Sequence, residues 1–174
     1  NPIKILKFAT MLKNSPNIGT GTVTLKNDPR VLPIGRLLRR TKINELPQLF
    51  NIFKGDLSII GPRPQTVRCF NAFQEDAQHK ISQVKPGLSG IGSIMFRNEE
   101  EIIGNEVNPD FFYNEVIMRF KGDLEMWYCR EHSFFVDLKL IFLTILVVVG
   151  GDPKFAYRLF KDLPPVPENL RHYL

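Results

Sequence analysis

The pattern of apolar and polar residues predicts a chain built mainly from short helices. Residues 3–12 form an extended segment, and residues 14–29, rich in Gly, Asn and Pro, form a loop. Helices are predicted over residues 33–40, 44–54, 65–83 and 111–120. The second of these is the best marked, because Asn44 suits an N-cap and Gly55 follows its last turn.

The most apolar stretch, residues 134–149, is open to three interpretations. Its ten uncharged residues at 140–149 are too few to cross a bilayer, since a spanning helix needs about 20. The stretch is therefore a core helix, a parallel strand, or a helix lying in a membrane interface. The tail at residues 150–174, which includes Pro164-Pro165 and Pro167, is predicted to be extended along the surface.

The composition indicates one folded domain. With 174 residues, of which 43% are hydrophobic and 11% aromatic, the chain can bury a core and is not disordered. Its two cysteines give neither a disulfide framework nor metal-ligand spacing. No basic-then-apolar signal sequence opens the chain at Asn1, and we expect that further sequence precedes it.

Positive charge is concentrated in the first part of the chain. Residues 1–64 contain 11 Lys or Arg against 3 Asp or Glu, whereas the whole chain has a net charge of +5. This excess indicates an anionic partner (nucleic acid, a phosphorylated ligand or membrane headgroups), or else a solvated basic face. The absence of zinc-finger, basic-zipper and RNA-recognition motifs disfavours nucleic acid.

The strongest candidate chemistry lies around Glu45, at a predicted helix N-terminus that attracts phosphate or carboxylate. The cations that precede it are Arg36, Arg39, Arg40 and Lys42. Arg63 follows in a corner, Gly61-Pro62-Arg63-Pro64, whose prolines restrict the backbone. A carboxylate among these cations would stay ionised and could hold Mg²⁺ or act on a phosphate. Alternatively, Glu45 could do no more than interact favourably with the positive end of the helix dipole.

Four segments together resemble one family, the bacterial sugar transferases, which are monotopic polyprenyl-phosphate phosphoglycosyl transferases. The matching segments are residues 28–49, Asn51 to Pro64 ending in Gly61-Pro62-Arg63-Pro64, Lys85-Pro86-Gly87-Leu88-Ser89-Gly90, and Trp127-Tyr128 with Asp137-Leu138-Lys139. The resemblance extends from Ile3 to about Val149. It implies that the whole chain, residues 1–174, is a single phosphoglycosyl transferase catalytic domain.

The resemblance also implies an activity. Family members transfer a sugar phosphate from a UDP-sugar to undecaprenyl phosphate, with Mg²⁺, and so start a capsule, O-antigen or other exopolysaccharide or lipopolysaccharide. An adjacent Asp-Glu pair supplies the nucleophile and a metal ligand, and it falls on Asn44 and Glu45. The phosphate-binding arginines fall on Arg39, Arg63 and Arg97.

Two positions depart from the family pattern. Asn44 replaces the nucleophilic Asp, and Ala9 stands where an Arg is usual. The substitution at position 44 has three explanations: a change made to trap a complex, a natural branch that relies on Glu45, or an inactive relative. We favour the natural branch, because the surrounding residues still suit the reaction. The alternative is a silent module that binds UDP-sugar and lipid phosphate.

The family's re-entrant membrane helix would precede Asn1, and residues 134–149 would lie in the membrane interface. We therefore expect an α+β, mainly helical domain with amphipathic interfacial helices, on the cytoplasmic face of the bacterial inner membrane. The expected partners are a UDP-sugar, undecaprenyl phosphate and the membrane surface, without nucleic acid; a homodimer is compatible with the sequence.

Overall fold

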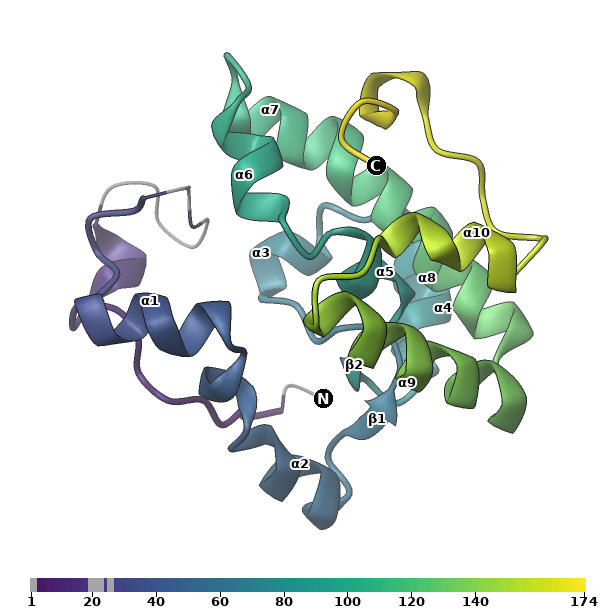
Figure 1. The fold of residues 1–174 in the computed structure, drawn as a ribbon, viewed down its shortest axis with the longest axis horizontal. Helices are drawn as coiled ribbons and strands as arrows, with labels where there is room; N and C mark the ends of the chain where they lie inside the picture. The colour runs from purple at the N-terminus through teal and green to yellow at the C-terminus, as the bar shows by residue number, and fades with distance from the viewer. Residues whose placement is uncertain (1–2, 19–23, 25–26) are drawn as a thin grey trace.

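The computed structural model describes residues 3–18, 24 and 27–174 (Figure 1). It is mainly helical with one small sheet, which confirms the predicted fold class. The α-helices and strands are α1 (Pro33–Arg40), α2 (Gln48–Lys54), β1 (Ser58–Ile60), α3 (Val67–Phe70), α4 (Glu75–Ser82), β2 (Gly87–Ser89), α5 (Ile91–Met95), α6 (Glu99–Gly104), α7 (Pro109–Phe112), α8 (Met118–Glu131), α9 (Phe134–Val148) and α10 (Ala156–Leu159). Short 3₁₀-helices are η1 (Ser15–Asn17), η2 (Ile43–Glu45), η4 (Pro153–Phe155) and η5 (Glu168–Leu170), and η3 (Tyr113–Ile117) is a π-helix. Residues 19–23 and 25–26 of the predicted loop lie outside the described residues.

Helix boundaries differ from the prediction in two places. The helix predicted from Asn44 is wrong at its start, because Asn44 lies in η2 and α2 begins at Gln48. Pro47 separates the two, since it has no N–H to donate to the carbonyl four residues earlier. The single helix predicted at residues 65–83 is in fact α3 and α4, separated by a turn in which Phe73 enters the core.

The sheet and the basic corner are built together. Strands β1 and β2 are parallel, with Ser58 opposite Gly87 and Ile60 opposite Ser89. A Cβ on Gly87 would lie 2.1 Å from the backbone nitrogen of Gly61, so only glycine allows the strands to approach this closely. The backbone N–H of Gly87 donates to the Pro62 carbonyl at 2.9 Å. The corner that carries Arg63 is thereby attached to the sheet.

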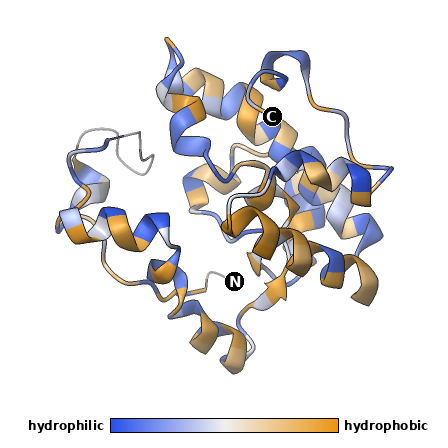
Figure 2. Ribbon diagram, in the orientation of Figure 1, coloured by the Kyte–Doolittle hydropathy of each residue, from blue (hydrophilic) through white to orange (hydrophobic). Residues whose placement is uncertain are grey.

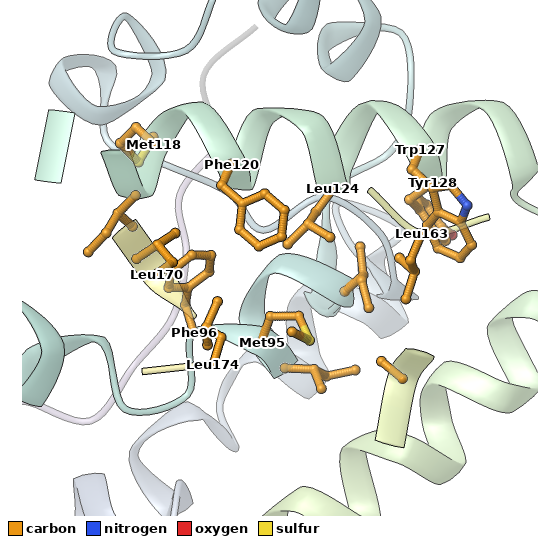
Figure 3. Packing of buried hydrophobic residues seen from close by; sticks show 14 of the residues in the cluster. Met95, Phe96, Met118, Phe120, Leu124, Trp127, Tyr128, Leu163, Leu170 and Leu174 are labelled. Carbon is orange, nitrogen blue, oxygen red and sulfur yellow. The ribbon is translucent and has the colours of Figure 1, made fainter. Parts of the chain in front are cut away.

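Helix α8 forms the centre of the core (Figure 3). Its Phe120 ring packs edge-on against Phe96, with centroids 6.0 Å apart, and its Trp127 ring packs against Phe160 at 5.0 Å. The predicted helix at residues 111–120 belongs to a longer helical run, α7–η3–α8, that supplies this core.

The C-terminal tail is more ordered than the predicted extended segment. It contains η4, α10 and η5. Four of its apolar side chains are buried in the core: Phe160, Leu163, Leu170 and Leu174. The tail therefore packs across the body of the protein (Figure 1).

The N-terminal segment crosses α1, η2 and α2 in extended form, as predicted (Figure 1). The backbone N–H of Phe8 donates to the Asn44 carbonyl at 3.0 Å, and that of Leu6 donates to Asn51 Oδ1 at 3.0 Å. A Cβ on Gly35 of α1 would lie 2.2 Å from the Thr10 carbonyl oxygen, so this glycine permits the crossing. These contacts bring Lys7 beside η2.

Helix α2 buries polar side chains and exposes apolar ones. Its polar residues Gln48 and Asn51 are buried, whereas Phe50 and Phe53 are 72% and 94% exposed. Asn51 is buried because its side chain binds the N-terminal segment, at the Leu6 N–H (3.0 Å) and the Lys4 carbonyl (2.8 Å). The apolar side chains Phe50 and Phe53 of this helix therefore face outward.

Residues 134–148 form helix α9, which excludes a parallel strand. Only Leu140, Leu143 and Val147 are buried. We call the exposed apolar side chains of Leu46, of α2 and of α9 the apolar face; it comprises Leu46, Leu49, Phe50, Phe53, Phe134, Phe135, Leu138, Phe142, Ile145 and Val148. Figure 2 shows both helices with hydrophobic residues along the lower side of the molecule. Among the described helices, none is long and apolar enough to cross a bilayer.

Candidate active site

Glu45 is presented by a tight turn rather than by a long helix. Lys42, the residue before η2, adopts the left-handed conformation (φ 59°), and its carbonyl accepts the Glu45 N–H at 3.0 Å. The turn η2 then directs Glu45 toward the Arg63 corner. Arg63 donates to both carboxylate oxygens, with Nη1 3.3 Å from Oε2 and Nη2 bonded to Oε1. The glutamate side chain is only 13% exposed.

The cations around Glu45 keep it ionised. Burial alone would raise the pKa of Glu45, but the charge and hydrogen bond of Arg63, with the charges of Lys7 and Lys42, lower the pKa below its ordinary value. Lys7 Nζ lies 3.7 Å from Glu45 Oε1. Burial, and then the charge of Arg63, lower the pKa of both lysines. More positive than negative charge is thus packed around one carboxylate.

This cluster opens into a cavity of about 580 Å³. Arg39 and Arg97 reach the same cavity from α1 and from the segment after α5. The guanidinium of Arg39 is held by Thr10 Oγ1 at 3.0 Å and by Glu100 Oε1 at 2.8 Å. The cationic lining residues are Lys7, Arg36, Arg39, Arg40, Lys42, Arg63, Arg97 and Lys121, and the acidic ones are Asp28, Glu45, Glu99, Glu100 and Glu101. Neutral polar lining residues include Thr10, Asn44, Ser93 and Asn98.

Two buried polar atoms in the cavity wall lack a hydrogen-bond partner among the described residues. They are Asn44 Oδ1 and Ser93 Oγ. Buried polar atoms are normally satisfied, by protein, water or ligand. An oxygen acceptor at Asn44 and a hydroxyl at Ser93 are therefore available to a bound group.

The five residues singled out in the sequence lie together. Asn44, Glu45, Arg39, Arg63 and Arg97 all line the one cavity. No group of three or more His, Cys, Asp or Glu side chains in the described part of the chain is placed to hold a metal ion. Glu45 could hold Mg²⁺ only with oxygens from Asn44 or from a bound phosphate, which is how proteins commonly bind Mg²⁺.

Sequence reasoning missed Lys7, Ser93, Lys121 and Glu125. Nothing in the sequence places Lys7 beside Glu45, since the pairing depends on the long-range path of the N-terminal segment. Lys121 is buried, donates to Glu99 at 2.5 Å, and lies 5.3 Å from the Phe96 ring centroid. Its charge is thus already paired.

Glu125 is an acid buried in α8 beneath the site. A Cβ on Gly92 would lie 2.5 Å from Glu125 Oε1, so the carboxylate packs directly on α5. Burial raises the pKa of Glu125 to about 8, against the lowering effects of Lys121 and of the Arg63 backbone and charge. Its position between Leu124 and Met126 in an apolar helix was the only signal in the sequence.

Glu125→Gln should stabilise the protein at neutral pH. The folded state keeps Glu125 protonated up to a pKa of about 8, whereas the unfolded state ionises near 4.5. The free energy of unfolding therefore falls as the pH rises from about 4.5 to 8, and this loss of stability is absent below that window. We expect Glu125→Gln to raise the free energy of unfolding by roughly 3 kcal/mol at pH 7 and hardly at all at pH 4. Urea unfolding at both pH values measures this, with the exposed Glu115→Gln as control; an equal gain at both pH values would contradict it.

Comparisons with known proteins indicate the family of this chain. The family model described as bacterial sugar transferase matches residues 1–151. The chain is 34% identical over 151 residues to the Bacillus subtilis (strain 168) protein named "uncharacterized sugar transferase EpsL", covering 87% of this chain and 65% of that protein.

Two further relatives have more specific names. The chain is 36% identical over 147 residues to the UDP-glucose:undecaprenyl-phosphate glucose-1-phosphate transferase of Escherichia coli (strain K12), covering 83% of this chain and 29% of the relative. It is 32% identical over 128 residues to the undecaprenyl-phosphate galactose phosphotransferase of Salmonella typhimurium (strain LT2), covering 74% of this chain and 23% of the relative. The chain thus spans less than two thirds of each relative. The match of the family model over most of the chain confirms the resemblance: the chain belongs to the bacterial sugar transferase family.

Proposed function

We propose that this chain transfers a sugar 1-phosphate from a UDP-sugar to undecaprenyl phosphate and so starts a membrane-linked glycan, such as a capsule, O-antigen or exopolysaccharide. The observation that carries the proposal is the ionised carboxylate of Glu45, surrounded by Arg63, Lys7 and Lys42 in one cavity. Such a cavity binds a diphosphate and offers one acidic ligand to a divalent ion. The names of the relatives support the polyprenyl acceptor, and one of them supports a UDP-sugar donor.

The cofactor in this proposal is Mg²⁺. Glu45 and the unpartnered Asn44 Oδ1 are hard oxygen donors of the kind Mg²⁺ takes, and phosphate oxygens of the donor would complete its shell. When bound, Mg²⁺ would neutralise charge that develops on the transferred phosphoryl group. Arg63 and Arg97 would hold the remaining phosphate oxygens.

With Asn44 in place of an Asp, we propose a direct displacement. An oxygen of the lipid phosphate attacks the β-phosphorus of the UDP-sugar, and the bond from that phosphorus to the bridging oxygen breaks. UMP leaves with the electron pair of that bond, and the lipid carries a diphosphate linked to the sugar. The residues contribute positioning and charge neutralisation, which dominate catalysis of phosphoryl transfer.

The second candidate is a silent binding module, and the observation that favours it is Asn44. An amide is not a nucleophile at phosphorus, so a site that depends on a covalent intermediate would be inactive with Asn44. Such a module would still bind a UDP-sugar through the same cations.

The two candidates are separated by measuring UMP. The protein is incubated with UDP-glucose or UDP-galactose, undecaprenyl phosphate and Mg²⁺, and each component is omitted in turn. UMP release that requires all components supports the enzyme. UDP-sugar binding by calorimetry without any UMP release would instead support the silent module.

We also propose that the apolar face lies on the cytoplasmic surface of the bacterial inner membrane. Contiguous exposed apolar area of this kind marks a membrane or protein contact. The basic cavity lies beside it, since the cavity residue Glu45 immediately precedes the first residue of that face, Leu46. A phosphate at headgroup level would then reach Glu45 without leaving the membrane.

Charged substitutions on the apolar face should release the protein from membranes. We expect the double variant Phe50→Glu/Phe53→Glu to lower the fraction that floats with anionic liposomes at least about tenfold. Two aromatic side chains that would insert among the lipids are replaced by charged ones. Val107→Glu is the matched control, since Val107 is fully exposed but lies in the loop between α6 and α7. Equal flotation of wild type and the double variant would remove the membrane proposal.

A further inference from the structure

A second, mostly apolar groove of about 320 Å³ runs between η2, the sheet and α9. One wall comes from η2 and β1, with Ile43 and Ile59, and the opposite wall from α9, with Ile141 and Ile145. On α9 the lining residues recur at helical spacing, as Ile141, Thr144, Ile145 and Val148. One continuous face of that helix therefore borders the groove.

The groove is continuous with the anion-binding cavity. Both are lined by Lys42, Glu45, Arg63, Ser93 and Arg97. One end of the groove is thus cationic and carries the unpartnered Ser93 hydroxyl. Leu46 and Ile145, which belong to the apolar face, also line the groove.

The Thr144 and Ser89 hydroxyls that line the groove already have hydrogen-bond partners. Thr144 Oγ1 lies 2.9 Å from Ser89 Oγ and donates to the Leu140 carbonyl at 2.7 Å. A hydrocarbon in the groove would therefore leave neither hydroxyl unpaired. A nucleotide base there would lose hydrogen bonds that apolar walls cannot replace.

We infer that this groove holds the first isoprene units of the lipid acceptor, with the acceptor phosphate at Arg63, Arg97 and Ser93. The inference rests on the proposed function and adds the binding site of the second substrate. It follows from charge at one end, apolar walls along the length, and an opening onto the apolar face. A groove of 320 Å³ is small for a ligand pocket, so the rest of a long chain would extend into the bilayer.

The test compares acceptors of increasing length: dimethylallyl, geranyl and farnesyl monophosphate. The KM for the acceptor should fall at least about tenfold for each added unit until the groove is filled, because each unit buries several carbons. Ile145→Trp, which obstructs the groove, should raise the KM for farnesyl phosphate at least about tenfold and leave the KM for the UDP-sugar and for dimethylallyl phosphate unchanged. Val149→Trp is the control, since Val149 is exposed at the end of α9 but neither lines the groove nor belongs to the apolar face; its KM values should stay within about twofold.

The outcomes separate this inference from the proposed function. UMP release with the same KM for every acceptor, or an equal change in KM for the two tryptophan variants, would overturn the assignment of the groove to the lipid acceptor. Neither result would contradict the proposed transferase function. A farnesyl phosphate with a diazirine on its second isoprene unit provides a readout independent of turnover. Its crosslinks, mapped by mass spectrometry, should fall on residues 141–148 or 59–60. Crosslinks elsewhere would overturn the assignment even if no UMP were released.

Discussion

Replacing Glu45 with Gln should reduce UMP release by about 10²- to 10³-fold. The substitution keeps the shape of the side chain and removes the ionised carboxylate that pairs with Arg63 and Lys7. Without it, the site loses its best oxygen ligand for Mg²⁺, and Arg63 loses the partner that orients its guanidinium. The measurement is initial UMP release at saturating UDP-sugar and lipid phosphate.

UDP-sugar binding should not be weakened by Glu45→Gln, although turnover is. Removing a negative charge leaves the cations of the cavity without a counter-ion, so calorimetry without Mg²⁺ should show UDP-sugar binding at least as tightly as in the wild type. Glu115→Gln is the matched control, because Glu115 also forms an ion pair with an arginine, at 2.7 Å from Arg119, but on the exposed surface. If Glu45→Gln lost donor binding and turnover together, or lost neither, Glu45 would not have the role assigned to it.

Asn44→Asp should accelerate the reaction by about 100-fold or more. Asn44 is buried in the cavity wall, and no described residue donates to its Oδ1, so a carboxylate of the same size fits there. The new carboxylate can attack the β-phosphorus and release UMP. The lipid phosphate then displaces the aspartate from the same phosphorus, so one difficult step becomes two easier ones.

Intact mass spectrometry checks this route directly. Without acceptor, Asn44→Asp should gain the mass of one sugar phosphate after incubation with a UDP-sugar, and the wild type should gain none. A wild-type adduct mapped to Glu45 would show that Glu45 itself is the nucleophile. An Asn44→Asp variant that is no faster and forms no adduct would show that position 44 does not face the β-phosphorus.

Local structure and the residues of the family motif could be predicted from the sequence. The helix at Pro33–Arg40 matches the spacing of its apolar residues, and the Gly61–Pro64 corner carries Arg63 to the site as its prolines suggest. The gathering of Asn44, Glu45, Arg39, Arg63 and Arg97 in one cavity agrees with the family motif that indicated them. These features depend on residues close in sequence or on the motif itself.

What could not be predicted depends on long-range packing. Periodicity shows that α2 has an apolar stripe, but the stripe faces outward because Asn51 binds the N-terminal segment. The same path brings Lys7 to Glu45. The tail was expected to be extended, yet Trp127 packs on Phe160 and Leu170 is fully buried. In each case a partner far away in the sequence decides the outcome.

The fate of the β-phosphorus tests the central claim most directly. A UDP-sugar labelled with ³²P at the β-phosphate is incubated with the protein, undecaprenyl phosphate and Mg²⁺, and the lipid and aqueous fractions are counted. Transfer of a sugar phosphate at Glu45 predicts that the label moves into the lipid while unlabelled UMP accumulates in water. Label that stays in the aqueous fraction, as UDP or as unchanged donor, would contradict it.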